Sequence, residues 1–585
     1  MRLPERLTTR MNDHLAVLYG SAHGAEVWSA MHERLQAFHQ QHPELVAESA
    51  DERLTERDVI LITYGDQIQS SDRPPLQNLA EVLTATVEGR ISGVHILPFY
   101  PYSSDDGFSV IDYTQVDSDL GSWEDVTRLG ENFRLMFDLV LNHISAQSRW
   151  FKAFLEGDPD FANAFIVVEP GTDLSMVTRP RARPLLTAVT TASGEERLVW
   201  TTFSEDQIDL NFTEPTVLLL MLDVLLFYVA QGAEIIRLDA IAYLWKRVGT
   251  SCIHLEETHR VVKLFRAALD AVAPGVMLIT ETNVPHAENI SYFGDGSDEA
   301  QLVYQFPLPP LVFHAILSGD ATYLTRWASS LAPPSPHTTF YNFLASHDGI
   351  GVRPVEDLLP PGEVAAMAAQ VRAHGGYVSY KANADGSQSA YELNISYFDA
   401  LSDPSGDDPL DTQVARFMVS QAIMLSLQGI PAIYVHSLFG SRNDREGVKQ
   451  TGRYRSINRG RFRRAELEAS LEDPMSLPSK VFKAYGQLLD IRTSQSAFHP
   501  SSGQIVLDPD PTIFALCRTA PQGDEWLLCL HNVSNAPVDL MLDLTTLLGS
   551  GPAAWHDLLS SARHTVEEGQ LRLTIAPYAV LWLHG

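Results

Sequence analysis

Eight short apolar runs, spaced widely along the chain, constrain its fold more than any other feature. They lie at residues 59–64, 93–99, 135–141, 234–238, 276–280, 302–306, 339–344 and 432–435. Helical patterns, such as those at 217–229 and 257–272, separate several of them. Continuous apolar strands that alternate with helices favour a buried parallel sheet, and eight such units favour a sheet closed on itself. The sequence therefore predicts an α/β protein built on a (β/α)8 TIM barrel.

Two connections between these runs are too long to be simple loops, and the last part of the chain has a different pattern. The segments 144–211 and 352–415 follow the third and seventh runs, and each is expected to form a subdomain inserted over the barrel mouth. Beyond residue 500, apolar and polar residues alternate as in antiparallel strands. We predict a helical N-terminal extension (1–56), a barrel (57–143, 212–351 and 416–499), the two inserted subdomains and a C-terminal antiparallel β domain (500–585).

The chain is strongly acidic, and this limits its partners. Of its 585 residues, 73 are Asp or Glu and 42 are Lys or Arg, which gives a formal net charge of −31. Such a field repels a nucleic-acid backbone or an anionic membrane, so neither is expected as a partner. No secretory signal and no long apolar window is present, so we expect a soluble cytoplasmic protein. The sequence does not indicate an oligomeric state.

The cysteines do not form a pattern typical of disulfides or of metal sites. Cys252, Cys517 and Cys529 lie far apart, without a paired motif, and are expected to be reduced. Cys517 and Cys529 lie in alternating strand patterns and are interpreted as small core residues. A catalytic role for Cys252 is a minor alternative.

Polar residues cluster where the apolar runs end. In parallel barrels the carboxyl ends of the strands meet at one face, so these side chains are expected to converge there. Several carboxylates in one mouth can bind a metal ion or perform paired acid/base work on a sugar. The residues are Asp105 and Asp106 after the second run, Asp138, Asn142 and His143 at the third, Arg237 and Asp239 at the fourth, Glu281 at the fifth, and His347 and Asp348 at the seventh.

Arg237 favours the sugar chemistry over the metal site. Side chains two residues apart share a face of a strand, so Arg237 and Asp239 point the same way. A cation there keeps Asp239 ionised and opposes a second cation, as suits a nucleophile better than a metal ligand. Glu281, on the next strand and in apolar company, is expected to have a raised pKa and to act as a general acid. Carboxyls on neighbouring strands can lie about 5 to 5.5 Å apart, the separation typical of retaining enzymes.

Four strings, DLVLNH, IIRLDA, ITETN and FLASHD, resemble the four conserved regions of the α-amylase clan, in the same order. Within that clan the chain resembles the sucrose phosphorylase family of retaining glucoside phosphorylases, which need no metal. Over nearly its full length it is most similar to the members that cleave 2-O-α-D-glucosylglycerate with phosphate. The likeness to the sucrose phosphorylase family is carried by the strings DDGFSVIDY, TRPRARPLL, TTFSEDQIDLNF, RLDAIAYLWKRVGTSC, VYQFPLPPLVFHAI, SHDGIGV and GSRNDREG.

The resemblance implies a role for each matching residue. Asp239 would be the nucleophile, Glu281 the acid/base, and Asp348 the carboxylate that stabilises the transition state. The glucose pocket would be lined by Asp105, Phe108, His143, Arg237, His347 and Arg455. Gln207 and Tyr391 match substrate-binding loop positions that face the acceptor and phosphate, and Arg181 and Arg183, in the RPRAR run, are expected to bind phosphate or the acceptor. No cofactor and no metal is expected, although Asn142 matches a residue that holds calcium in amylases of the clan.

Several alternatives stay open at this point. Phe108 and Tyr391 can be core aromatics, and the arginine run can be an ordinary solvated loop that supplies no local positive field for phosphate. The same carboxylates also serve hydrolases and transglucosidases, and a catalytically dead barrel would serve only in binding. Arg353 follows SHDGIGV, where a basic residue was expected slightly later, at Glu356. Glucosylglycerol, sucrose and sucrose 6-phosphate therefore remain alternative substrates.

Overall fold

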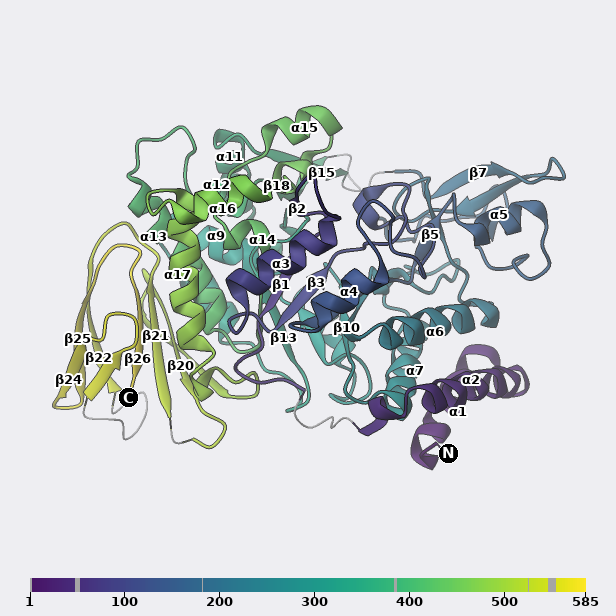
Figure 1. Cartoon of the computed structure of the whole chain (residues 1–585), viewed down its shortest axis with the longest axis horizontal. Coiled ribbons are helices and arrows are strands. Elements are labelled where there is room, and N and C mark those ends of the chain that lie inside the picture. Colours follow the sequence, from purple (N-terminus) through teal and green to yellow (C-terminus); the bar gives the residue numbers. More distant parts are fainter. Residues whose placement is uncertain (1–2, 48–52, 181–182, 383–386, 524, 545–553) are drawn as a thin grey trace.

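Eight parallel strands form a closed barrel at the centre of the molecule, which confirms the predicted (β/α)8 fold (Figure 1). The computed structural model describes residues 3–47, 53–180, 183–382, 387–523, 525–544 and 554–585. The barrel strands are β1 (Ile60–Thr63), β3 (Gly93–Ile96), β4 (Arg134–Val140), β10 (Ala233–Asp239), β11 (Met277–Thr280), β12 (Leu302–Tyr304), β13 (Thr339–Phe343) and β17 (Ile430–Tyr434). Each of the eight predicted runs overlaps a barrel strand.

The strands are almost entirely buried, which explains their continuous apolar sequences. Every residue of β1, β3 and β13 is buried, because helices cover the outside of a parallel barrel and side chains fill its inside. The last strand begins two residues before the predicted run, since Ile430 and Pro431 already pair with Tyr341 and Asn342 of β13. Gly93 lies where a Cβ atom would come within 2.6 Å of the end of the Ile60 side chain, so a larger residue there would displace Ile60.

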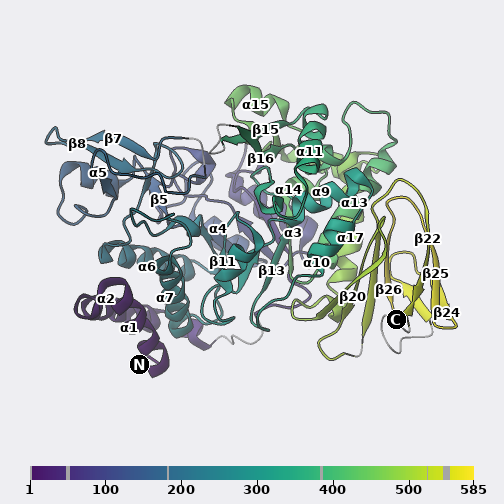
Figure 2. The same cartoon turned by 180° about the vertical axis from the view of Figure 1, so that it is seen from behind.

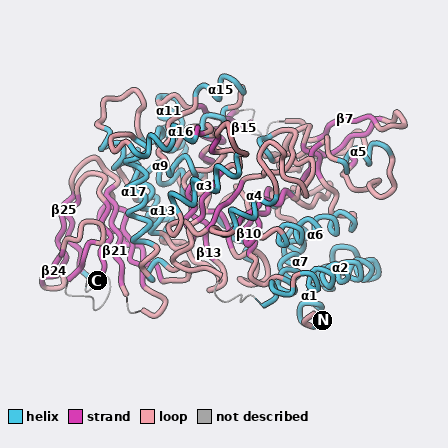
Figure 3. Tube along the Cα trace, in the orientation of Figure 1, coloured by secondary structure: helices cyan, strands magenta, loops and turns pink. Residues whose placement is uncertain are grey.

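Helices surround the barrel, as Figures 2 and 3 show. The apolar helix α6 begins with Pro215, a residue suited to the first helical position, and buries most of its length. The larger helices that follow the barrel strands are α3 (Pro75–Val87), α4 (Trp123–Gly130), α6 (Pro215–Ala230), α7 (Glu256–Val272), α9 (Leu308–Ser318), α10 (Thr322–Ala328), α13 (Leu410–Ser426) and α17 (Leu477–Arg492). Shorter ones are α8 (His286–Asn289), α12 (Tyr397–Leu401), α14 (Val435–Leu438), α15 (Arg445–Thr451) and α16 (Arg464–Glu472).

Each of the two long connections carries small sheets of its own. After β4, strands β5 (His143–Ser145) and β9 (Gln207–Asp209) pair antiparallel, and a second sheet has the order β6-β8-β7. After β13, a three-stranded sheet has the order β14-β16-β15. The remaining elements of these connections are α5 (Arg149–Glu156), β6 (Val167–Val168), β7 (Leu186–Thr190), β8 (Glu196–Trp200), β14 (Ile350–Gly351), α11 (Pro361–Ala373), β15 (Tyr377–Ala382) and β16 (Gln388–Asn394). A short pair, β2 (Ile68–Gln69) and β18 (Phe462–Arg463), lies near the barrel.

The C-terminal part is an eight-stranded sheet with antiparallel pairing, as predicted from the alternating pattern. Its strands are β19 (Gly503–Asp510), β20 (Ile513–Thr519), β21 (Trp526–Asn532), β22 (Val538–Asp543), β23 (Ala554–Asp557), β24 (Arg563–Glu567), β25 (Gln570–Ile575) and β26 (Val580–His584). Cys517 and Cys529 lie buried in β20 and β21, and all three cysteines are free thiols. The interpretation of Cys517 and Cys529 as small core residues is therefore confirmed.

An N-terminal helical hairpin packs on the opposite end of the molecule from the C-terminal sheet (Figure 1). It consists of α1 (Glu5–Tyr19) and α2 (Ser21–Gln41), and it lies against α6 and α7. Arg34 of α2 pairs with Asp223 of α6 at 2.9 Å, and the Tyr19 hydroxyl donates to the carbonyl of Phe212 at 2.9 Å. In the part of the chain that the structure describes, no helix is both long and apolar enough to cross a membrane.

Candidate active site

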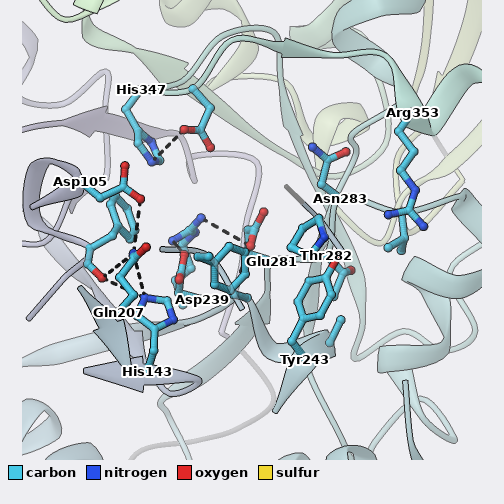
Figure 4. Close-up of a pocket in the computed structure, with 18 of the residues that line it drawn as sticks. Asp105, His143, Gln207, Asp239, Tyr243, Glu281, Thr282, Asn283, His347 and Arg353 are labelled. Carbon is cyan, nitrogen blue, oxygen red and sulfur yellow. Dashed lines mark hydrogen bonds and ion pairs between the residues drawn. The ribbon is translucent and has the colours of Figure 1, made fainter. Parts of the chain in front are cut away.

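A pocket at the carboxyl ends of the barrel strands brings together most of the residues singled out in the sequence (Figure 4). Its empty volume is about 810 Å³. Of the predicted site residues, Asp105, Phe108, His143, Gln207, Arg237, Asp239, Glu281, His347, Asp348, Tyr391 and Arg455 line it. Arg183 lies on the wall of an adjoining pocket, which shares Asp105, Tyr391 and Arg455 with the first. Arg181 lies outside the described residues. Cys252 is buried elsewhere and does not line the pocket.

Asp239 ends β10 and is held by Arg237. The Arg237 guanidinium donates to Asp239 Oδ1 at 2.8 Å and also bonds Asp138, which lies opposite it on β4. Burial would raise the pKa of Asp138, but Arg237 and His95 lower it to about 2. Arg237 is thus fixed from behind by an ionised carboxylate, and the shared face predicted for Arg237 and Asp239 is confirmed.

Glu281 follows β11, directly beside Asp239. Ala240, the residue after Asp239, has a φ of 50°, and its amide donates to Glu281 Oε2 at 3.1 Å. Such a φ is uncommon outside glycine and is typical of functional sites. The backbone after β10 therefore turns toward the carboxyl group of the neighbouring strand.

The pKa values of Asp239 and Glu281 are both raised, mainly by burial. Two like charges so close together repel each other, so the pair favours one proton and one charge. Arg237 donates directly to Asp239 but lies 4.0 Å from Glu281. Burial raises the pKa of Asp239 to about 8, but the Arg237 contact opposes this rise and favours the charge on Asp239 over Glu281, which is the division that a nucleophile and a general acid require.

Asp348 is ionised by a different set of neighbours. Burial would raise its pKa, but Arg455, His347 and Arg459 hold it well below its usual range. Arg455 pairs with Asp348 and with Glu392 of β16, to which its Nε donates at 3.0 Å. Arg459 bonds Asp106, and it lies 3.5 Å from Asp348. The two arginines thus fix Asp348 at the mouth.

Gln207 and four side chains of the predicted glucose pocket form one connected wall. Gln207 donates to Asp105 Oδ2 at 3.3 Å and lies 3.1 Å from His143 Nε2, as Figure 4 shows. The Phe108 ring stacks on His347 at 4.9 Å. Burial lowers the pKa of His143 to about 4 and that of His347 to about 3, so both rings are neutral hydrogen-bonding groups at pH 7. Asp105 has a φ of 55° and Asp106 one of 50°, so this loop is strained where it faces the pocket.

The expected loop position of Gln207 is wrong. Gln207 lies in β9, where its pairing with Ser145 of β5 directs it toward Asp105 and His143. A strand of only three residues has no recognisable pattern in the sequence. Tyr391, also expected in a loop, lies in β16, and its backbone carbonyl accepts from Val352.

Lys246 lies directly beside Asn142. Its ammonium lies 2.5 Å from both Asn142 Oδ1 and Asp209 Oδ2, and its side chain is 3% exposed. A cation in this position already neutralises Asp209, and a second one beside it would be repelled. Among the described residues, no group of three or more His, Cys, Asp or Glu side chains could hold a metal ion.

The sequence did not predict Tyr243, Asn283, Glu392 or Arg459 as site residues, although it did point to Arg353, the basic residue that follows SHDGIGV. Tyr243, Asn283 and Arg353 line the side of the pocket beyond Glu281 (Figure 4). Around Asp348, Glu392 pairs with Arg455, and Arg459 pairs with Asp106. Tyr243 lies three residues after the IIRLDA string, and Asn283 ends the ITETN string, so their places along the chain were a usable signal. Glu392 had no such signal, since its partner Arg455 lies 63 residues away.

The barrel and its mouth of ion-paired carboxylates define an α-amylase-type glucosyl-transferring enzyme. The family described as the alpha amylase catalytic domain matches residues 87–348. The glucosylglycerate phosphorylase of Allomeiothermus silvanus is 51% identical over 92% of this chain and 94% of its own, and that of Escherichia coli is 44% identical over 98% and 99%. The chain belongs to the glucosylglycerate phosphorylase family. The sucrose 6F-phosphate phosphorylase structure from Thermoanaerobacter thermosaccharolyticum matches with a TM-score of 0.71 at 26% identity, covering 82% of this chain and 94% of that one.

Proposed function

We propose that this protein is a retaining phosphorylase that transfers the α-glucosyl group of 2-O-α-D-glucosylglycerate to phosphate, giving α-D-glucose 1-phosphate and glycerate. The division of charge and proton between Asp239 and Glu281, fixed by Arg237, carries the proposal. The relatives named above supply the substrate, since sucrose and glucosylglycerol phosphorylases are more distant.

The reaction proceeds in two displacements. Asp239 attacks the anomeric carbon as the bond to glycerate breaks, and Glu281 gives its proton to the departing oxygen. Phosphate then attacks the same carbon, Glu281 takes the proton of the attacking hydroxyl, and the bond to Asp239 breaks. Two inversions restore the α configuration. Asp348 stabilises the flattened, positively charged ring through its negative charge, and Asp105, His143, Gln207, His347 and Arg455 bind the glucose hydroxyls or position the groups that do.

Phosphate is proposed to enter through the adjoining pocket. That pocket is lined by Arg183, Lys381 and Arg453, of which Lys381 pairs with Glu356 and Arg453 with Asp106, so Arg183 is the cation among the three for which no ion pair is seen in the described residues. Arg181 is assigned to the same task on the strength of the resemblance alone. No metal or cofactor takes part. The cytoplasmic location and the division into domains stay predictions.

A panel of glucosides tests the proposal. Glucosylglycerate, glucosylglycerol, sucrose and sucrose 6-phosphate are each supplied with phosphate, and glucose 1-phosphate is followed with its anomeric form by proton NMR. We expect the α-anomer, with glucosylglycerate the best donor. Asp239→Asn should lower turnover by several orders of magnitude, because no glucosyl-enzyme forms. A first product with the β configuration, or substantial turnover by Asp239→Asn, would contradict the mechanism.

A further inference from the structure

Three arginines line the catalytic pocket, and one of them differs from the others in its partners. Arg237 pairs with Asp138 and Asp239, and Arg455 pairs with Asp348 and Glu392. Arg353 forms no ion pair with any carboxylate of the described residues. Its neighbours are uncharged or weakly basic: it contacts the Tyr243 hydroxyl, and its field reaches His254. Within the described residues, Arg353 is therefore the pocket arginine whose charge no carboxylate neutralises.

The position of Arg353 separates it from the glucose-binding wall. Figure 4 shows Arg353, Asn283 and Tyr243 on one side of Glu281, and Asp105, Gln207 and His143 on the other. Arg353 begins a 3-10 turn (Arg353–Val355) after β14, and the amide of the preceding Val352 is bonded to the carbonyl of Tyr391. The turn is thus attached to the small sheet over the mouth. Glu281, the acid/base group, lies between the two sides. The leaving group that Glu281 protonates, and the acceptor hydroxyl that it deprotonates, must therefore lie on the side of Arg353.

Asn283 adds a second unused polar group on the same side. Its side-chain oxygen is buried and has no hydrogen-bond partner in the described structure. Its position is tightly fixed, since a Cβ atom on Gly351 would come within 2.9 Å of the Asn283 amide. A buried acceptor without a donor is costly unless a ligand supplies one. A hydroxyl group bound beside Glu281 would satisfy it.

We propose that Arg353 and Asn283 form the acceptor subsite, in which Arg353 binds the carboxylate of a short 2-hydroxy acid and Asn283 binds its terminal hydroxyl. Glycerate has three polar groups, and the proposal gives each a partner: the carboxylate to Arg353, the reacting O2 to Glu281 and the 3-hydroxyl to Asn283. A guanidinium binds a carboxylate through two parallel hydrogen bonds, which an uncharged polyol cannot form. Arg353 is thereby a specificity-determining residue. The inference rests on the proposed function, because it assumes a glucosyl-enzyme on Asp239.

The test uses α-glucosyl fluoride as donor, so that no phosphate competes for the cation. The C1–F bond breaks, Asp239 bonds C1, and fluoride departs without needing a proton from Glu281. Once Asp239 is bonded to C1 its negative charge is gone, so Glu281 can release its proton to water. The acceptor hydroxyl then attacks C1, the bond to Asp239 breaks, and the hydroxyl proton goes to Glu281. D-Glycerate, glycerol and D-lactate are compared as acceptors, and their glucosides are quantified together with free glucose. Fluoride release with water alone measures the proposed double displacement independently of the acceptor.

Arg353→Gln should lower the efficiency ratio of glycerate to glycerol by at least about tenfold, the usual effect of losing a charge-assisted contact. Arg353→Lys keeps the positive charge but not the two parallel donors, so its glycerate-to-glycerol ratio should lie between those of the wild-type enzyme and Arg353→Gln. Asn283→Ala should lower the ratio of glycerate to lactate, since lactate has no 3-hydroxyl. Arg326→Gln, which removes an exposed arginine on α10, is the control for the loss of one positive charge.

A glycerate-to-glycerol ratio that changes less than fivefold in Arg353→Gln, with normal fluoride release, would overturn the proposal. If Arg353→Gln lowered only the rate with phosphate as acceptor, the proposal would also be overturned, because Arg353 would then bind phosphate. If wild-type enzyme released no fluoride at all, the proposed function itself would fail. Thermal unfolding of each variant separates an altered subsite from an altered fold, and should Arg353→Gln not fold, Arg353→Lys carries the same comparison.

Discussion

The ammonium of Lys246 lies 2.5 Å from Asp209 Oδ2, in a place where the Lys246 side chain is 3% exposed and that of Asp209 is fully buried. Removing one partner of a buried pair leaves an uncompensated charge, which typically costs about 3 to 5 kcal/mol. Lys246→Met should therefore lower the free energy of unfolding by about that amount. Lys480→Met is the matched control, because Lys480 pairs with Asp411 at the surface, where pairs contribute about 0 to 1 kcal/mol. Equal losses in urea denaturation would contradict the role of Lys246.

The same ion pair predicts that chelators change neither the activity nor the stability of the protein. Since Lys246 already neutralises Asp209 and bonds Asn142, EDTA should change neither turnover nor the thermal midpoint, and added calcium should restore nothing. Both quantities are measured before and after dialysis against EDTA. A loss of activity that calcium reverses would mean that Asn142 holds a metal after all.

Glu281→Gln should discriminate between leaving groups. An alcohol leaves poorly without a proton, so cleavage of a glucosyl alcohol should fall by about 10² to 10⁴-fold, the usual contribution of general acid catalysis. Fluoride needs no proton, so the burst of fluoride from α-glucosyl fluoride should fall far less. Rapid-mixing measurements on both donors check this. Similar losses on both would show that Glu281 is not the acid.

The pH dependence of kcat/KM should differ in the same way. The pKa of Glu281 is raised, mainly by burial, so its proton is present below that pKa and is lost as the pH rises through it. Cleavage of a glucosyl alcohol should therefore decline on the alkaline side. With α-glucosyl fluoride, kcat/KM reports only the steps up to irreversible fluoride release, and this decline should be absent. An alkaline decline of the same size with both donors would assign it to another group.

Arg183 separates phosphorolysis from hydrolysis. Water needs no cation, whereas phosphate is bound through charge-assisted hydrogen bonds. Arg183→Ala should raise the ratio of free glucose to glucose 1-phosphate at limiting phosphate, by about three- to tenfold, because Arg183 is exposed and its contacts are screened. The combined Arg181→Ala and Arg183→Ala variant should raise it further. An unchanged ratio in the double variant would place the phosphate site elsewhere.

Buried histidines should make the protein sensitive to acid. Burial lowers the pKa of His531, in β21, to about 4. In the unfolded chain this histidine binds a proton near pH 6.5, whereas in the folded chain it does so only near pH 4. The free energy of unfolding therefore decreases as the pH is lowered from 6.5 to 4, by up to about 1.4 kcal/mol per pH unit for this histidine. His531→Gln should show a smaller loss of stability between pH 6.5 and 4.5 in urea denaturation. His337→Gln, at the surface, is the control, and identical pH dependence in all three proteins would contradict this account.

The barrel was predictable because its signal is local. Buried parallel strands are continuous apolar runs, and the residues that end them reach one mouth by the geometry of the fold, so Asp239, Glu281 and Asp348 could be found from the sequence. The partners of the arginines could not. Glu392 and Asp106 meet Arg455 and Arg459 only through the packing of distant loops. The absence of a described carboxylate beside Arg353 is likewise a property of three-dimensional packing that no motif records.

The N-terminal hairpin holds the two helices that lead into the catalytic strands. Helix α6 runs directly into β10, which ends at Asp239, and α7 runs into β11, which Glu281 follows. Arg34 and Tyr19 of the hairpin attach to α6 and to the segment just before it. The hairpin is therefore placed to act as a brace for catalytic alignment: on warming, an enzyme without residues 1–47 should lose turnover several degrees before its barrel melts, while the intact enzyme should lose both together.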